Sequence, residues 1–503
     1  GGGGGGGGRG VGGGGGGGRG AAVSGTVWSY THRMSNPNVE ALGQRVEMLV
    51  DVAHARLVTG GAFSEEELRA YEDLALYRLY ERHRDVLTEA IEGAAAASSG
   101  GRPAAAPHRS WRAFEAQFGR DLHPGGRALP SGHRAAEVFA CFFQIRRAFW
   151  HIFSNIVGAS APAAELRAAV WRSIFTHDLR RYYRCLLGRM GDFTTLVVGE
   201  SGTGKELVAQ AVGRSRYVPF DPGTGRFTQD AAGSFVAVNL AALSPTLIES
   251  ELFGHARGAF TGAVAERVGY LESCPPQGCV FLDEVGELEG AVQVKLLRVL
   301  QERVFQRLGE TRPRRFEGKI IAATNRDLAA EMHAGRFRHD LYYRLCSDVV
   351  RTPALREQLR DRPEDLRAMV GFIVRRIVAR EPDAVIDGVA AWIEGNLGER
   401  YAWPGNFREL EQCVRSVIVR GGYDPAASMR SSAPGPEDGD AAALARAVAE
   451  MSLTAQQLVD RYAWLAYQRD GTYEAVARRL GVDRRTAKAG VVRAGAGEAK
   501  PQA

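Results

Sequence analysis

The segment Thr194-Thr195-Leu196-Val197-Val198-Gly199-Glu200-Ser201-Gly202-Thr203-Gly204-Lys205 decides how the centre of this chain folds. Its first five residues are β-branched and apolar and predict a short strand, while helical sequence begins at Lys205. Glycines between strand and helix let backbone N–H groups turn inward around phosphate oxygens, and the helix N-terminus adds positive potential. We therefore predict a phosphate-binding loop made of Gly199, Glu200, Ser201, Gly202, Thr203, Gly204 and Lys205. The plainer alternative is a glycine turn.

A second motif supports the loop. Cys279–Glu284 is an apolar run that ends in two acids, about 80 residues after the loop. Asp283 is suited to hold Mg²⁺, and Glu284 to orient and deprotonate an attacking water. Paired acids at a strand end are often only a solvated terminus, but together with Lys205 they predict a site that hydrolyses ATP. One residue departs from the general motif, because Glu206 stands where a Ser or Thr usually binds the metal.

Strands and helices alternate around these motifs. Short apolar runs at Phe235–Val238 and Ile320–Thr324 read as further strands, with helical patterns between them. This alternation predicts an α/β domain with a three-layer, parallel sheet. The helical sequence at Glu364–Arg420 predicts a small lid.

Composition limits the remaining classes. The chain has 503 residues, is 45% hydrophobic and 24% charged, and carries a net charge of +6. These values exclude a collagen, a mucin or a wholly disordered chain and permit a nucleic-acid partner. Six separated cysteines predict reduced thiols rather than a metal or disulfide site. No apolar run reaches the ~20 residues that span a bilayer, and we expect a cytoplasmic protein.

Changes in composition along the chain predict six segments. The first three are a disordered glycine-rich tail (1–37), a helical N-terminal region of unknown role (38–189) and the α/β subdomain (190–362). The other three are the lid (363–423), a linker (424–450) and a C-terminal helix-turn-helix domain (451–503). Within the helical region, Ser64 and Glu67 predict a helix start and Gly93–Ser110 predicts a linker.

Two neighbouring segments carry a resemblance to a known family. Glu249–His255 leads into Gly258-Ala259-Phe260-Thr261-Gly262-Ala263, and both resemble signatures of the sigma-54-dependent transcriptional activators, bacterial enhancer-binding proteins of the AAA+ class. That family's own phosphate loop has an acid after the lysine, as Glu206 has here. The resemblance covers roughly Asp192–Gly422. It implies an AAA+ ATPase that uses ATP and Mg²⁺, assembles a hexameric ring and remodels sigma-54 RNA polymerase holoenzyme from the closed to the open complex.

The resemblance also implies roles for single residues. Asn239 resembles the switch residue that restrains the catalytic glutamate, and Thr324 and Asn325 resemble the sensor of the γ-phosphate. Cationic roles follow for three residues: Arg338 and Arg344 as arginine fingers, and Arg408 as the second sensor. Within the loop Gly258, Ala259, Phe260, Thr261, Gly262 and Ala263, Phe260 and Thr261 would form the tip that contacts sigma-54. Taken alone, a glycine-flanked aromatic is more often a tucked turn.

The C-terminus has helix-turn-helix spacing. Thr472–Leu480 reads as one helix, Gly481 supplies the turn, and Asp483 can cap a second helix. The second helix carries Arg484, Arg485, Thr486 and Lys488, which would enter the major groove of double-stranded DNA. An ordinary basic hairpin is the alternative, but the position after an ATPase domain resembles the Fis-like tail of the same family.

Two segments look longer than the family usually has. They are Ser215–Gly233 and Leu355–Leu366, and we expect both to form surface loops. Two rival functions remain at this stage. One is a non-catalytic DNA-binding repressor, and the other is an AAA+ remodeller of a different protein.

Overall fold

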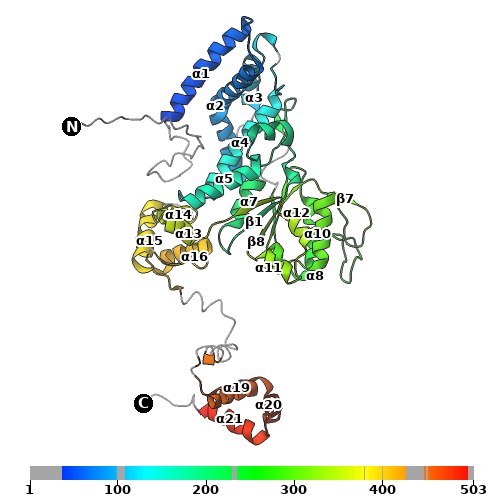
Figure 1. Ribbon diagram of the computed structural model, residues 1–503, viewed down its shortest axis with the longest axis vertical. Helices are drawn as coiled ribbons and strands as arrows, with labels where there is room; N and C mark the ends of the chain where they lie inside the picture. Colours follow the sequence, from blue (N-terminus) through cyan, green and yellow to red (C-terminus); the bar gives the residue numbers. More distant parts are fainter. Residues whose placement is uncertain are drawn as a thin grey trace, which may run out of the picture. The chain divides into compact units, whose positions relative to one another are not determined.

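The structure, a computed structural model, describes residues 37–98, 108–127, 129–228, 235–378, 380–398, 400–425, 444, 447–448, 451 and 453–496. Most of the expected glycine-rich tail and of the expected linker at 424–450 lies outside these residues. The chain divides into two compact units, one up to Gly422 and one from Tyr423 on (Figure 1).

A five-stranded sheet with the order β4-β5-β8-β1-β9 forms the centre of the first unit. All its pairings are parallel, with Leu196 opposite Ala322 and Val238 opposite Leu282. In chain order the strands are β1 Thr195–Val198, β4 Phe235–Asn239, β5 Cys279–Asp283, β8 Lys319–Thr324 and β9 Asp348–Arg351. The predicted α/β class with a parallel sheet is confirmed.

Helices cover both faces of this sheet. One face packs in a core with α8, α10 and α12, and the other packs in a core with α4, α5 and α7. The helices are α4 Ala135–Asn155, α5 Ala161–Phe175, α7 Lys205–Gly213, α8 Pro245–Phe253, α10 Gly290–Glu302 and α12 His339–Leu345. Shorter elements complete the unit: α6 Leu179–Arg181, α9 Tyr270–Ser273, α11 Leu328–His333, β6 Val304–Phe305 and β7 Arg314–Arg315.

The N-terminal helices continue into the core of the sheet. Ala148 on α4 and Val170 on α5 are fully buried in one cluster with Val197, Phe281 and Ile321 of the strands. The remaining helices of this region form a bundle with α4: α1 Pro37–Val58, α2 Glu65–Ser98 and α3 His108–Leu122 (Figure 1). The core around the sheet therefore includes helices that precede its first strand.

Helix α2 begins as its sequence predicts but ends later. The Ser64 N–H donates to Glu67 Oε2 at 2.7 Å and the Glu67 N–H to Ser64 Oγ at 3.2 Å, which is the expected capping box. The linker predicted from Gly93 is wrong at both ends, because α2 continues to Ser98 and α3 begins at His108. The alanines after Gly93 favour helix more than that glycine opposes it.

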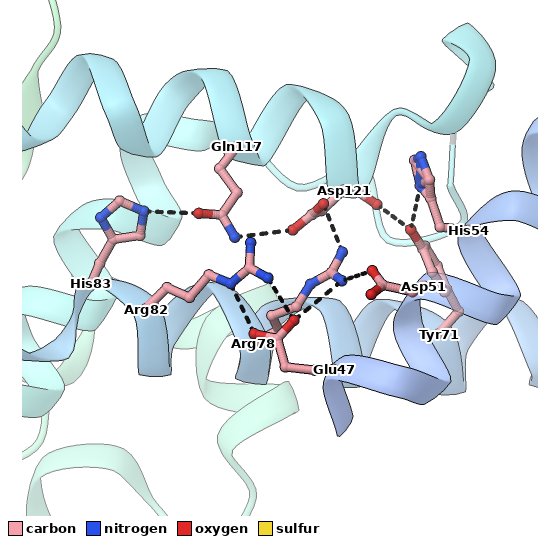
Figure 2. Close-up of polar contacts among 9 residues, drawn as sticks. All are labelled: Glu47, Asp51, His54, Tyr71, Arg78, Arg82, His83, Gln117 and Asp121. Atoms are coloured by element: carbon pink, nitrogen blue, oxygen red, sulfur yellow. Dashed lines mark hydrogen bonds and ion pairs between the residues drawn. The ribbon is translucent and has the colours of Figure 1, made fainter. Parts of the chain in front are cut away.

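An ionic network centred on the buried Arg78 and Asp121 joins α1, α2 and α3 (Figure 2). The Arg78 side chain is 4% exposed and donates to Asp51 at 2.6 Å and to Asp121 at 2.8 Å. Tyr71 Oη donates to the Asp121 carbonyl at 2.7 Å, and Arg82 holds Glu47 through two bonds. Because removing one partner would leave a buried charge unpaired, this network fixes how the three helices align.

Both segments expected to be surface loops contain secondary structure with buried residues instead, the first of them described as far as Thr228. Residues from Ser215 contain a hairpin of β2 (Phe220–Asp221) and β3 (Arg226–Phe227). Phe220 is 5% exposed, and its ring lies 4.9 Å from Trp111 and 4.8 Å from Phe139. The second segment forms α13 (Leu355–Asp361), with Leu355 fully buried. The expectation is wrong in both cases, because each segment carries apolar residues that its neighbours bury.

The lid region and the second unit are helical. Three further helices follow α13, namely α14 Asp365–Val374, α15 Pro382–Asn396 and α16 Asn406–Arg420. The second unit consists of α19 Ala455–Asp470, α20 Tyr473–Leu480 and α21 Arg484–Ala496 around a small core that includes Val476 and Val491. Among the described residues, all six cysteines are free thiols, and no helix is long and apolar enough to cross a membrane.

Replacing Phe220 tests whether the hairpin supports the N-terminal bundle. Phe220→Ala should lower the free energy of unfolding of the bundle by about 3 kcal/mol, because it empties an aromatic cluster. Urea unfolding followed by tryptophan fluorescence measures this. Phe193→Ala is the matched control, since Phe193 is 41% exposed and its loss should change stability by less than about 0.5 kcal/mol. Equal effects of the two variants would contradict the packing role.

Candidate functional site

The glycine-rich loop connects β1 to α7 at the carboxyl edge of the sheet. Gly202 and Gly204 have φ values of 78° and 87°, a region that glycine adopts without strain. A Cβ on Gly202 would lie 2.3 Å from the Gly405 carbonyl oxygen. The first N–H groups of α7 have no acceptor within the helix and face this loop. The loop therefore has the open backbone that a phosphate group requires.

Lys205 lies between the loop and the acids of the neighbouring strand. Its side chain is 7% exposed, and Nζ donates to the carbonyls of Gly199 and Glu200 at 3.1 and 3.3 Å. Glu284 Oε1 lies 3.6 Å from the same Nζ. The cation is thus held by weak, local partners that anionic oxygens could replace.

The two acids at the end of β5 differ in surroundings. Burial, and next the charge of Glu284, raise the pKa of Asp283. Glu284 has a left-handed backbone with φ 56°, which is strained for a residue with a side chain, and its Oε2 accepts the Asn325 N–H at 3.1 Å. The Glu284 carboxylate therefore lies between Lys205 Nζ and the Asn325 N–H.

The structure places the expected switch and sensor residues at the same edge. Asn239 ends β4 in register with Asp283, and its side chain accepts the Ala241 N–H at 3.0 Å rather than binding Glu284. Thr324 ends β8, is fully buried and accepts the Arg326 N–H at 3.1 Å. The contact to Glu284 comes from the Asn325 backbone.

The lid holds the loop through Asn406, which the sequence analysis missed. Asn406 is fully buried, accepts the Leu355 N–H at 2.8 Å, and donates to the Ser201 carbonyl at 3.0 Å and to Glu200 at 3.2 Å. Arg356 also forms a two-bond pair with Glu200. Arg356, and next Asn406, lower the pKa of Glu200 to about 2.

Three other predicted residues lie on the loop or beside it. Arg408, on the exposed side of α16, donates to Ser201 Oγ at 3.1 Å. Glu206 is in the first turn of α7, where it accepts from Gln210 at 3.2 Å. Thr203, at the base of the loop, lies 2.7 Å from the Thr352 hydroxyl. The lid and the loop therefore meet through several side chains that act on the same short turn.

A largely apolar pocket of about 240 Å³ adjoins the loop. Its walls come from the loop, from α14 and α16 of the lid, and from the connection between α4 and α5, and include Ile156, Val157, Leu207, Phe372 and Ile373. A flat apolar group attached to a phosphate chain suits this shape. Sequence analysis missed these residues because they come from three separated segments.

The α4–α5 connection is fixed to the lid. Asp365 accepts the N–H groups of Ala159 and Ser160 at 2.7 and 2.8 Å, and Asp361 accepts that of Ala161 at 2.7 Å. Arg167 also donates to the Gly158 carbonyl at 2.7 Å. The N-terminal helices and the lid therefore share one wall of the pocket.

The two expected arginine fingers have different surroundings. Arg338 precedes α12 and forms a two-bond pair with Asp340 at 3.0 and 2.7 Å. Arg344, at the end of the same helix, is exposed and has no ion-pair partner in the part of the chain that the structure describes. Arg344 is therefore available to a second molecule.

The loop Gly258–Ala263 is a closed turn with an exposed tip. The Gly258 N–H donates to the Ala263 carbonyl at 2.9 Å, and Gly258 and Gly262 have φ values of 81° and 101°. Phe260 is 42% exposed, with its ring edge-on to His255 at 5.0 Å, and Thr261 is exposed. The tip thus presents an apolar ring and a hydroxyl, while Ala259 lies close to Gly309.

The second unit presents the basic residues of α21 on its surface. The Thr486 N–H and hydroxyl donate to Asp483, which caps the helix. Arg485 and Lys488 are exposed, while Ala487 and Val491 on the same helix are buried in the core. Arg484 forms an ion pair with Glu474 at 2.7 Å. The exposed face of α21 is therefore basic.

Comparison with known proteins identifies the central region. Residues 170–350 match the model of the Sigma-54 interaction domain. The Nif-specific regulatory protein of Azotobacter vinelandii is 42% identical over 289 residues, which are 57% of this chain and 51% of that protein. The transcriptional regulatory protein ZraR of Escherichia coli (strain K12) is 43% identical over 227 residues, 45% of this chain and 47% of that protein.

The matches to whole proteins are partial. The anaerobic nitric oxide reductase transcription regulator NorR of Klebsiella pneumoniae (strain 342) is 40% identical over 53% of this chain and 45% of its own length. The chain thus spans about half the length of the curated relatives it matches. Among solved structures, NtrX from Brucella abortus has a TM-score of 0.41 at 24% identity, covering 76% of this chain and 80% of that one.

A substitution at Asn406 tests the contact between lid and loop. Asn406→Ala should weaken binding of a fluorescent ADP analogue about tenfold, because the buried Leu355 N–H loses its acceptor and the loop loses a donor. A fluorescence titration measures the affinity. Asn396→Ala, on an exposed turn of α15, should bind as the unchanged protein does. An unaltered affinity in Asn406→Ala would show that the lid does not position the loop.

Proposed function

We propose that this chain, whose residues 170–350 match the Sigma-54 interaction domain, hydrolyses ATP to activate transcription by sigma-54 RNA polymerase. The main support for this proposal is that four groups lie together at one edge of the sheet: Lys205, Asp283, Glu284 and the Asn325 N–H. The same unit also carries the exposed Phe260–Thr261 tip. Such a protein would open promoter complexes while bound to upstream DNA, and would work in the cytoplasm.

The residues divide the chemistry among them. Lys205 and the N–H groups at the start of α7 would bind the phosphate chain, and the apolar pocket would hold the base. Glu284 would orient the attacking water and accept its proton, while Asn325 and Lys205 keep its carboxylate in place. Asn239 ends β4 and Thr324 ends β8, on either side of β5 at the same edge, where they could report the state of the γ-phosphate.

The donor set fits Mg²⁺. Asp283 and Glu284 are adjacent acids, and the pKa of Asp283 is raised by burial and by Glu284, so a divalent cation would relieve their repulsion. Mg²⁺ prefers carboxylate and phosphate oxygens, and when bound it neutralises charge on the phosphates. Asp283 is the residue that we propose as its ligand.

Arg344 supports a catalytic site shared between subunits. It is exposed and has no ion pair among the described residues, so it could neutralise charge in the site of a neighbouring copy. This arrangement requires a ring, which we propose to be a homohexamer. Arg338 would assist after release from Asp340, and Arg408 would contact the nucleotide from the lid.

Complementation between two inactive variants tests this arrangement. Glu284→Gln and Arg344→Ala should each lower ATP turnover about 100-fold or more while retaining ATP binding. An equimolar mixture should recover part of the turnover, because the intact Glu284 of one copy meets the intact Arg344 of another. The measurement is phosphate release. Glu289→Gln is the control, since Glu289 is exposed and should leave turnover unchanged. A mixture as inactive as its components would refute sharing through Arg344.

The Phe260–Thr261 tip tests the choice of partner. Thr261→Ala should retain ATP turnover and lose binding of labelled sigma-54, measured by fluorescence anisotropy with ADP and aluminium fluoride. Thr311→Ala, an exposed threonine outside the loop, is the matched control and should bind normally. Normal sigma-54 binding by Thr261→Ala would exclude the tip as the contact. Binding of no sigma-54 by the unchanged protein, with turnover intact, would favour a remodeller of another client.

The basic face of α21 supports binding of double-stranded DNA, with Arg484, Arg485 and Thr486 beside the bases. Lys488→Ala should weaken binding of a mixed-sequence duplex and reduce the salt slope by about 1, because one phosphate contact is lost. Titration of the full chain at several salt concentrations measures both. Arg461→Ala, exposed on α19, should leave the slope unchanged. A slope equal in both variants would contradict the assigned face.

A further inference from the structure

A second cavity, of about 450 Å³, lies within the N-terminal region and outside the nucleotide site. Its walls come from α2, α4, the end of α5 and the π-helical turn Tyr182–Leu186, a helix form that often marks functional sites. Apolar and aromatic side chains dominate the lining, among them Leu76, Phe142, Ile145 and Trp171. Its volume falls in the range of sites for small organic molecules.

Two residues that line this cavity carry a buried polar atom outside the hydrogen-bond network. His133 Nδ1 has no hydrogen-bond partner within the described part of the chain, and Tyr183 Oη, which the Arg134 backbone approaches, has no acceptor there for its own hydrogen. The two rings lie 4.8 Å apart, edge to face. A single hydroxyl on a ligand could donate to the histidine nitrogen and accept from the tyrosine, satisfying both atoms. Buried polar atoms in folded proteins are rarely left unpaired.

The buried acid of the lining, Glu72, already accepts the Ser131 N–H at 2.9 Å and the Ser131 hydroxyl at 2.5 Å. Burial lowers the pKa of His133, raises that of Tyr183, and raises that of Cys141 to about 12. The ion pair of Asp73 with Arg180 lies at the partly exposed rim and balances its own charge. An uncharged ligand would therefore lose less solvation on entry than an ion.

We infer that this cavity binds a neutral, mostly apolar small molecule with one hydroxyl group, and that this ligand regulates the nucleotide site. Helix α4 connects the two places. Phe142, Ile145 and Phe149 on α4 line the cavity, and Asn155 and Ile156 at its end line the apolar pocket beside the phosphate loop. Asp365 attaches the connection that follows to the lid.

Because α4 is packed against the sheet, a ligand that shifts it would change the pocket wall. The strength of such coupling is equal in both directions, so nucleotide would alter ligand affinity by the same factor. The inference that the ligand regulates the nucleotide site rests on the proposed function, since it needs nucleotide in the pocket. The inference that the cavity binds a ligand is independent of the proposed function.

Titration of the full chain with N-phenyl-1-naphthylamine, a neutral fluorophore that brightens in apolar surroundings, tests binding. We expect one saturable site with micromolar affinity. Leu76→Trp fills the cavity and should weaken binding at least tenfold. Leu42→Trp is the matched control, since Leu42 is 53% exposed on α1, and it should bind normally. Absence of saturable binding, or an equal loss in both variants, would overturn the assignment.

Tyr183→Phe is a smaller substitution that tests the same site if Leu76→Trp fails to fold. In the unchanged protein, 1-naphthol should displace the fluorophore with about fivefold higher affinity than naphthalene, and Tyr183→Phe should reduce that preference. An unaltered preference in this variant would refute the polar contact.

Coupling is measured separately. Saturation with the fluorophore should shift the affinity for a fluorescent ATP analogue at least threefold in the unchanged protein and not in Leu76→Trp. An unshifted affinity would overturn the regulatory part. Fluorophore binding requires neither ATP turnover nor sigma-54, so loss of the proposed function would leave that titration unchanged.

Discussion

The parallel pairing of β5, β8 and β1 is the constraint on which the site depends. Parallel neighbours end at the same edge, so the residues that follow each strand meet there although they are far apart in sequence. Glu284 follows β5, Asn325 follows β8, and Lys205 follows β1 by way of the glycine loop. Their contacts of 3.1 and 3.6 Å are consequences of this register. An antiparallel strand in the middle would place one of them at the opposite edge.

A second consequence concerns the faces of the sheet. A central strand such as β8 is buried on both sides, with Lys319–Thr324 all inaccessible, so both faces need a cover. Helices α4 and α5 provide part of that cover on one face. The N-terminal region is therefore part of the core around the sheet. Helix α4 contacts the sheet through packed side chains, and residues at its end line the apolar pocket beside the glycine-rich loop.

The sequence predicts the local parts of the site and misses the parts made by tertiary contact. Lys205 and the glycines are readable because the strand, loop and helix that need them are consecutive. Asn406, Asp365 and Ile156 are not readable, since each acts on a segment distant in the chain. The sequence predicts a surface loop where the structure has the β2–β3 hairpin, because the Pro and Gly residues between Phe220 and Phe227 are typical of loops. Their burial depends on Trp111 and Phe139, which no local pattern connects to them.

Arg338, just before α12, and Arg344, near its end, differ in whether an acidic side chain already binds them. Arg338 and Arg344 both lie at the ends of the helix, but Arg338 is paired with Asp340 and Arg344 is exposed without an ion pair among the described residues. An exposed pair contributes about 1 kcal/mol or less, so Arg338 is only lightly restrained. A neighbouring anion would engage Arg344 at no cost in broken pairs and Arg338 only after that cost. In the shared site that we propose, Arg344 would therefore make its contact before Arg338.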